Sequence, residues 1–233
     1  DLDSVTKIGD FAFSGCSSLE AFEGFAKVKN IGYRAFEGCS KLSGEIELSV
    51  AESVGEYAFI DCVGLTSFIA QRLSVLGPNA FVGCVNLEEC LISGEAVVCS
   101  ETFSNCSKLE KVSLLGKTRF AESFSVSAWG YWRPPFGGCT NLREVVLGEN
   151  FTRIPGETFR GLNLLTNVTV TSSLTDINDG VFMDCSSLKS LAGADSVTKI
   201  GDSAFFVCSS LEAFEGFANV KNIGYRAFGG CSS

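Results

Sequence analysis

The stretch Ile31-Gly-Tyr-Arg-Ala-Phe36-Glu-Gly-Cys39-Ser-Lys-Leu42 carries the pattern that decides the fold. This pattern, Ile-Gly-x-x-Ala-Phe-x-Gly-Cys-x-x-Leu, recurs along the whole chain. Its phenylalanine returns after 23, 23, 22, 22, 33, 23, 23, 23 and 23 residues, at Phe13, Phe36, Phe59, Phe81, Phe103, Phe136, Phe159, Phe182, Phe205 and Phe228. A period of this length indicates a solenoid, in which each repeat forms one turn and packs against its neighbours. We therefore predict about ten turns of 22–23 residues in a single domain, residues 1–233.

Each repeat also contains a short segment in which apolar and polar residues alternate. The clearest examples are Leu142-Arg-Glu-Val145-Val-Leu147 and Leu165-Thr-Asn-Val168-Thr-Val170. Alternation of this length predicts a strand with one face inward, and stacked strands form a parallel sheet. The Ala-Phe segment is expected to form a single helical or 3-10 turn. The glycine before it is expected to need an unusual backbone angle, at Gly9, Gly32, Gly55, Gly77, Gly201 and Gly224.

The repeated pattern resembles the BspA-like, or Treponema-type, leucine-rich repeat over essentially the whole chain. The resemblance implies an α/β solenoid, namely a curved right-handed superhelix with a concave parallel β-sheet and short helical or 3-10 turns. It also implies a surface or secreted protein used in adhesion and host contact, with no catalytic residues to carry over. We therefore expect an extracellular or cell-surface location, with any signal or anchor outside residues 1–233.

The composition excludes several classes of function. Hydrophobic residues make up 45% of the 233 residues and charged ones 19%, which is typical of a folded globular chain. Histidine is absent, so triads and metal sites that need an imidazole are excluded. The net charge of −9 argues against nucleic acid and anionic lipid as partners. No apolar run approaches about 18 residues, so no direct membrane insertion is expected.

Cysteine occupies the same slot in nine turns, at Cys16, Cys39, Cys62, Cys84, Cys106, Cys139, Cys185, Cys208 and Cys231. Leu162 fills that slot in another turn, so we predict a buried apolar position and not thiol chemistry. Cys90 takes a core position of a strand. Cys99 stands where other turns have the corner glycine, and it is the one thiol for which reactivity, or pairing with Cys90, stays open. We expect no cofactor and no metal site, because pairs such as Glu88-Glu89 lack further ligands at calcium-loop spacing.

The single long interval marks an insertion of about ten residues within 118–135. It contains both tryptophans of the chain, and insertions in solenoids lie in loops, where binding residues concentrate. Tryptophan, tyrosine and arginine are also enriched at binding hot spots, so the candidate ligand-binding residues are Trp129, Tyr131, Trp132 and Arg133. The alternative is a local lid over the solenoid flank, with Arg133 stacked on a ring. The two are compatible.

The outward positions of the predicted sheet are mostly hydroxyls and carboxylates. The candidate ligand-binding residues on this face are Glu88, Glu110, Arg143, Glu144 and Asn167. Such a face either binds a ligand, for instance a basic one, or is simply solvated. Three acceptor sequons, at Asn105, Asn150 and Asn167, would carry glycans only in a chain secreted by a eukaryote.

Residues 3–39 and 195–231 are identical at 32 of 37 positions, which indicates a super-repeat of eight turns. We interpret the chain as an excerpt of a longer array, or as one whose ends stack on other copies.

The sequence leaves two hypotheses for the function of the protein. The first is non-enzymatic recognition of a protein or glycan ligand. The alternative is a structural scaffold or filament element that acts through repeat stacking and end-to-end self-association. An enzyme is not expected, because the chain lacks a nucleophile paired with a base.

Overall fold

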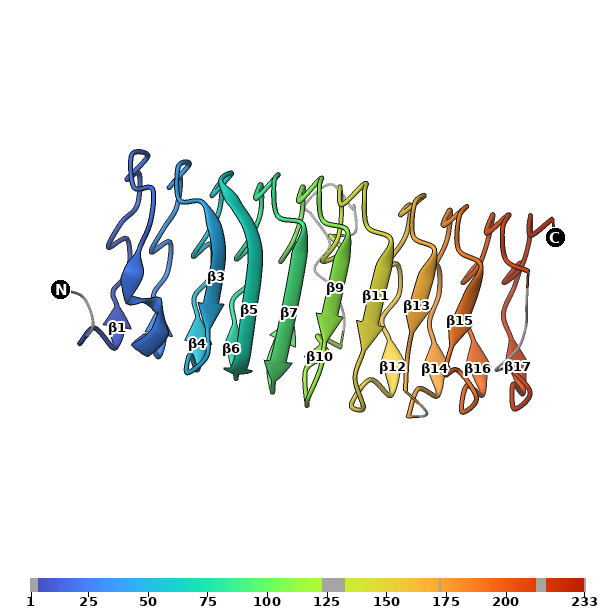
Figure 1. Cartoon of the computed structure of the whole chain (residues 1–233). Coiled ribbons are helices and arrows are strands. Elements are labelled where there is room, and N and C mark those ends of the chain that lie inside the picture. The colour runs from blue at the N-terminus through green and yellow to red at the C-terminus, as the bar shows by residue number, and fades with distance from the viewer. Residues whose placement is uncertain (1–3, 123–132, 172, 213–216, 233) are drawn as a thin grey trace.

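The computed structural model describes residues 4–122, 133–171, 173–212 and 217–232. It shows turns stacked side by side in one row, with the longer strands on one face (Figure 1). These strands form a seven-stranded parallel sheet whose spatial order follows the chain. They are β3 (Gly44–Leu48), β5 (Leu65–Leu73), β7 (Glu89–Gly94), β9 (Lys111–Leu114), β11 (Glu144–Leu147), β13 (Asn167–Thr169) and β15 (Ser190–Ala192).

A second series of two-residue strands contributes one strand per turn, ten in the described residues. They are β1 (Lys7–Ile8), β2 (Asn30–Ile31), β4 (Ser53–Val54), β6 (Val75–Leu76), β8 (Val97–Val98), β10 (Arg119–Phe120), β12 (Arg153–Ile154), β14 (Asp176–Ile177), β16 (Lys199–Ile200) and β17 (Asn222–Ile223). All their pairings are parallel, and they fall into three ladders that are interrupted between β6 and β8 and between β10 and β12. The predicted fold class, a leucine-rich-repeat solenoid with a parallel sheet, is confirmed.

A column of stacked phenylalanine rings forms the centre of the solenoid. The ten rings of the repeat stack pairwise with centroids 5.1–5.6 Å apart and planes within 20° of parallel. The rings from Phe36 to Phe205 are completely or almost completely buried. Each such ring contributes roughly 1.5–3 kcal/mol through burial. The column also continues across the insertion, because Phe103 and Phe136 stack at 5.6 Å.

The repeated cysteine makes a hydrogen bond that sequence reasoning missed. In each turn from Cys39 onward that has the cysteine, the thiol donates to the phenylalanine carbonyl of the turn before it, at 3.0–3.2 Å. The predicted apolar character of the slot is confirmed, since most of these side chains are buried. The thiol is therefore both a small apolar group and a weak donor that joins neighbouring turns.

The Ala-Phe segment differs from its prediction, because it forms consecutive turns and not a helical or 3-10 turn. Half of its amide groups bond to the next turn, as Phe59 N–H does to the Ala80 carbonyl at 2.8 Å. A helix would need those amides for its own bonds. Left-handed residues such as Tyr57 and Asp61, both with φ of 56°, also stop a right-handed helix from continuing. The described 3-10 helix, η1 (Glu23–Lys27), lies outside this segment.

The corner glycines are needed for a reason other than the predicted one. None of the six, all of which are described, lies in the left-handed region. A Cβ on Gly55 would instead lie 2.6 Å from the carbonyl carbon of Gly32 in the turn before. Gly9, in the first turn, has nothing within 4 Å of its would-be Cβ. Glycine is therefore required by the close approach of stacked backbones.

This contrast predicts different losses of stability for the same substitution at two corner glycines. Gly55→Ala should lower the free energy of unfolding by about 1–3 kcal/mol, because the added methyl group forces two backbones apart. Gly9→Ala should change it by less than about 1 kcal/mol. Urea unfolding followed by circular dichroism measures both. Equal losses for the two variants would show that backbone proximity is not the reason for the glycine.

Candidate ligand-binding surface

The five candidate residues of the sheet face come together in the structure. Glu88, Glu110 and Arg143 precede consecutive strands, and their backbones are linked in sequence. The Glu110 amide donates to the Glu88 carbonyl at 2.8 Å, and the Arg143 amide to the Glu110 carbonyl at 2.9 Å. Glu144 on β11 is in register with Asn167 on β13. Four of the five side chains are exposed and Glu144 is half-buried, so the face is accessible.

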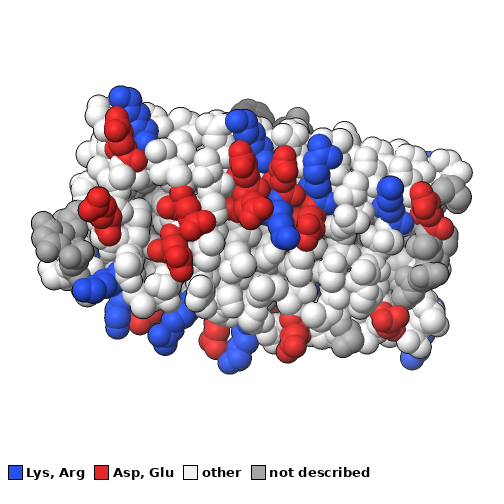
Figure 2. All heavy atoms as spheres, in the orientation of Figure 1, with Lys and Arg blue, Asp and Glu red and all other residues white. Residues whose placement is uncertain are grey.

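The charges on this face partly neutralise one another. Lys111 on β9 lies in register with Glu89 on one side and Glu144 on the other. Its ammonium group lies 3.1 Å from the Glu144 carboxylate, with both side chains more than 40% exposed. A pair this exposed contributes about 0–1 kcal/mol and is weakened by salt. Figure 2 shows the resulting group of mixed charges over the starts of the middle strands. The pairing of Lys111 was missed because it depends on strand register.

The insertion is described only at its two ends. Trp129, Tyr131 and Trp132 lie outside the described residues, so their role stays a prediction. Arg133 is described, and its guanidinium pairs with the Glu101 carboxylate at 2.6 Å. Glu101 belongs to the turn after β8. Among the described residues, the partner of Arg133 is therefore a carboxylate on a connecting turn. The rings of the insertion lie outside these residues, so stacking of Arg133 on one of them stays a prediction.

The sequon asparagines are all exposed. Asn105 has a left-handed backbone, with φ of 61°, and Asn167 lies on β13. The side-chain amide of Asn150 donates to the Gly116 carbonyl at 2.9 Å. Accessibility permits modification at each position, and glycosylation itself stays a prediction.

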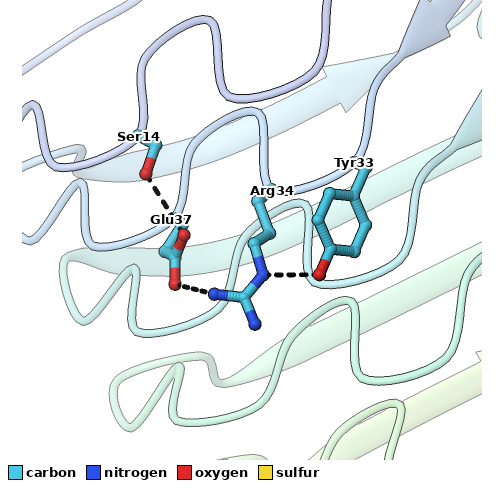
Figure 3. Close-up of polar contacts among 4 residues, drawn as sticks. All are labelled: Ser14, Tyr33, Arg34 and Glu37. Carbon is cyan, nitrogen blue, oxygen red and sulfur yellow. Dashed lines mark hydrogen bonds and ion pairs between the residues drawn. The ribbon is translucent and has the colours of Figure 1, made fainter.

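A second polar cluster, which sequence reasoning missed, joins the first three turns. Figure 3 shows its contacts within the first two. The Arg34 guanidinium donates to the Tyr33 hydroxyl at 2.9 Å and to the Glu37 carboxylate at 2.6 Å, and it lies 4.8 Å from the centre of the Tyr57 ring. Ser14 donates to the other Glu37 oxygen at 3.1 Å. Because these groups bond to one another across turns, the cluster ties the stack together.

All eleven cysteines are described, and all are free thiols. Cys90 is buried and Cys99 is half-buried, and they are not joined. Burial raises the pKa of Cys99, with Arg119 acting in the opposite direction. A raised pKa reduces the thiolate fraction, so Cys99 lacks the environment of an activated nucleophile.

No group of three or more potential metal ligands occurs within the described residues. None of the helices described there has the length and apolar character needed to cross a bilayer.

The family comparison agrees with the repeat pattern. A family model described as BspA type Leucine rich repeat region matches in six copies, over residues 2–110, 45–127 and 134–233. A leucine-rich repeat protein from Bacteroides ovatus is 26% identical, with 98% of this chain and 69% of that chain covered and a TM-score of 0.46. The T. pallidum leucine-rich repeat protein is 22% identical, with 89% and 72% covered and a TM-score of 0.40.

A leucine-rich cell surface protein from Faecalibacterium prausnitzii is 20% identical, with 98% of this chain and 81% of that chain covered and a TM-score of 0.42. None of the curated proteins matches the chain.

The buried thiols predict a loss of stability at high pH. Burial raises the pKa of Cys39 to about 11 and that of Cys208 to about 12. In the unfolded chain these thiols ionise near pH 8.5. The unfolded state therefore loses protons first, and the stabilisation present below about pH 8.5 is lost as the pH rises towards 11–12.

Thermal unfolding between pH 7 and 11 measures this effect, and two single substitutions assign it. Cys62→Val removes a buried thiol whose pKa burial raises, and it should flatten the fall of Tm with pH. Cys16→Val removes an exposed thiol and should leave the slope unchanged. The same pH dependence in both variants would contradict the assignment to the buried thiols.

Proposed function

Because the chain belongs to the family of BspA-type leucine-rich repeat proteins, we propose that it is a non-enzymatic recognition protein of the cell surface or extracellular space. Its partner in this proposal is a protein or glycan ligand. The observation that carries the proposal is the accessible face of the seven-stranded sheet, where Glu88, Glu110 and Arg143 stand in one column. Parallel strands hold such side chains at the fixed spacing of about 4.8 Å, which gives a rigid and extended contact surface.

The chemistry of the described residues supports recognition over catalysis. Each thiol with a shifted pKa has it raised, which is opposite to the shift that activates a nucleophile. The charges of the sheet face are exposed, and exposed carboxylates and cations steer a partner and select it more than they strengthen its binding. A partner with complementary charge is therefore favoured on this face.

Charge reversal tests the sheet face directly. Glu110→Lys should weaken binding to immobilised matrix proteins, glycans or intact cells at least tenfold, because it reverses the charge in the middle of the column. Glu56→Lys makes the same change in net charge on an exposed turn residue away from the sheet, and it should leave binding unchanged. Surface plasmon resonance at two salt concentrations gives both values.

If Glu56→Lys weakens binding as much as Glu110→Lys does, the sheet face is not the recognition surface. The insertion remains part of the proposal, and the double variant W129A/W132A tests it in the same assay.

We propose self-association through stacking as a second role. Phe13 and Leu19 are half-buried and Cys16 is exposed, whereas their copies Phe205, Leu211 and Cys208 are buried. In the last turn it is the second copy that is exposed: Ile223 is 62% exposed, whereas its counterpart Ile31 in the first copy is only 2% exposed. A turn stacked on either surface, from a second copy or from further repeats, would bury these apolar groups as it does inside the array.

This second role predicts concentration-dependent assembly of the chain. Ile223→Lys should shift the sedimentation profile towards the monomer, because a charge in a stacking surface opposes burial. Val75→Lys replaces a side chain that is similarly exposed, at 54%, but lies on an internal turn, and it should not alter assembly. A sedimentation coefficient that stays monomeric at every concentration would overturn self-association of this chain.

A further inference from the structure

A hollow of about 560 Å³ opens at the carboxyl ends of β9, β11 and β13, and no candidate residue of the sheet column lines it. It is lined by residues 115–117 and 146–150 and by two threonines, Thr169 and Thr171. Its volume falls within the roughly 300–1,000 Å³ of small-molecule sites. All of its lining residues come from three adjacent turns, so only the stacked structure creates it.

Gly148 lies in the wall of the hollow, between two neighbouring turns. The Gly148 amide donates to the Leu114 carbonyl at 2.7 Å, which places Gly148 beside Leu115 on the neighbouring turn. On its other side, the Thr171 hydroxyl donates to the Gly148 carbonyl at 3.1 Å. A Cβ on Gly148 would lie 3.0 Å from the Leu115 Cα, so the close approach of the two turns favours glycine here.

The floor of the hollow is apolar and its rim is polar. Leu115 and Val146 are half-buried, and between them lie the bare backbones of Gly116 and Gly148. Glu149 and Thr169 are exposed, and neither side chain has a hydrogen-bond partner within the part of the chain that the structure describes. The Asn150 amide nitrogen is held by the Gly116 carbonyl at 2.9 Å, which fixes the orientation of its side chain at the rim.

The charges at the rim argue against an anionic ligand. Lys117 is the only cation that lines the hollow, and its ammonium group is already paired with Glu95 at 2.8 Å. Glu149 adds a second carboxylate close by. Figure 2 shows acidic and basic side chains next to one another along this edge of the sheet. A phosphate, sulfate or carboxylate would therefore meet a net negative rim.

These features match the chemistry of a neutral sugar. A saccharide presents C–H groups on its faces, which fit the apolar floor, and hydroxyls around its edge, which both donate and accept. Carboxylate, amide and hydroxyl side chains offer the complementary donors and acceptors. We propose that the hollow between the ends of β9, β11 and β13 binds a neutral saccharide unit. The inference names a ligand class for the recognition role and rests on that proposed function.

The test uses the 233-residue chain and a panel of neutral hexoses, N-acetylhexosamines and their disaccharides. Saturation-transfer NMR should detect binding of at least one neutral sugar, and titration should then show an affinity at least tenfold weaker in Glu149→Ala. Glu52→Ala is the matched control, because Glu52 is an exposed glutamate in the loop between β3 and β4, which corresponds to the loop that carries Glu149. It should bind like the unsubstituted chain. Circular dichroism confirms that both variants are folded.

Three outcomes overturn the inference: no neutral sugar of the panel binds, Glu149→Ala binds as tightly as Glu52→Ala, or a sulfated disaccharide or lysine-containing tripeptide binds in preference to the neutral sugars. These outcomes are separate from the charge-reversal test of the sheet column. If Glu110→Lys abolishes macromolecular binding while no sugar binds, the recognition role stands and only the saccharide inference fails. If a sugar binds at Glu149 while Glu110→Lys has no effect, the inference stands and the sheet column is not the recognition surface.

Discussion

The contact between one turn and the next is the interaction on which the whole structure depends. A turn of about 23 residues has its phenylalanine, leucine and isoleucine on one side of a thin loop and cannot bury them alone. Stacking places each phenylalanine ring on the ring before it, at 5.1–5.6 Å. Across the same boundary, the cysteine thiol donates to the preceding phenylalanine carbonyl. Packing and hydrogen bonding therefore act on one repeated interface.

That interface explains which residues are constrained and which are free. The corner glycines are required where two backbones approach too closely for a Cβ, as Gly55 and Gly32 do. The inward side chains must be apolar, because they are buried together with the phenylalanine column. What remains for function is the outward side of the strands, the loops between strands and the insertion. Both candidate surfaces on the described residues, the charged column and the hollow beside Gly148, belong to this free set.

The insertion shows how a solenoid tolerates an added segment. The phenylalanine column and the thiol bond pass from Phe103 to Phe136 and Cys139 with the same geometry as elsewhere. The short-strand ladder, in contrast, is interrupted between β10 and β12, as it also is between β6 and β8, where nothing is inserted. Pro155 directly follows β12 and has no amide hydrogen, so it cannot donate a bond to the preceding turn. Gly55, at the equivalent position after β4, makes such a bond to the Ile31 carbonyl. The core therefore stays continuous while one flank changes.

Much of this was determined by the sequence alone. The 23-residue period, the alternation in segments such as Leu142 to Leu147 and the repeated cysteine were enough to predict the solenoid, the parallel sheet and the core. They also identified the column of Glu88, Glu110 and Arg143, because outward positions follow from strand periodicity. Only the tertiary structure decided the rest, namely the reason for the glycines, the Lys111–Glu144 pair, the Arg34 cluster and the hollow at Gly148. Each of these depends on the register and separation of different turns, and periodicity within one turn does not contain that information.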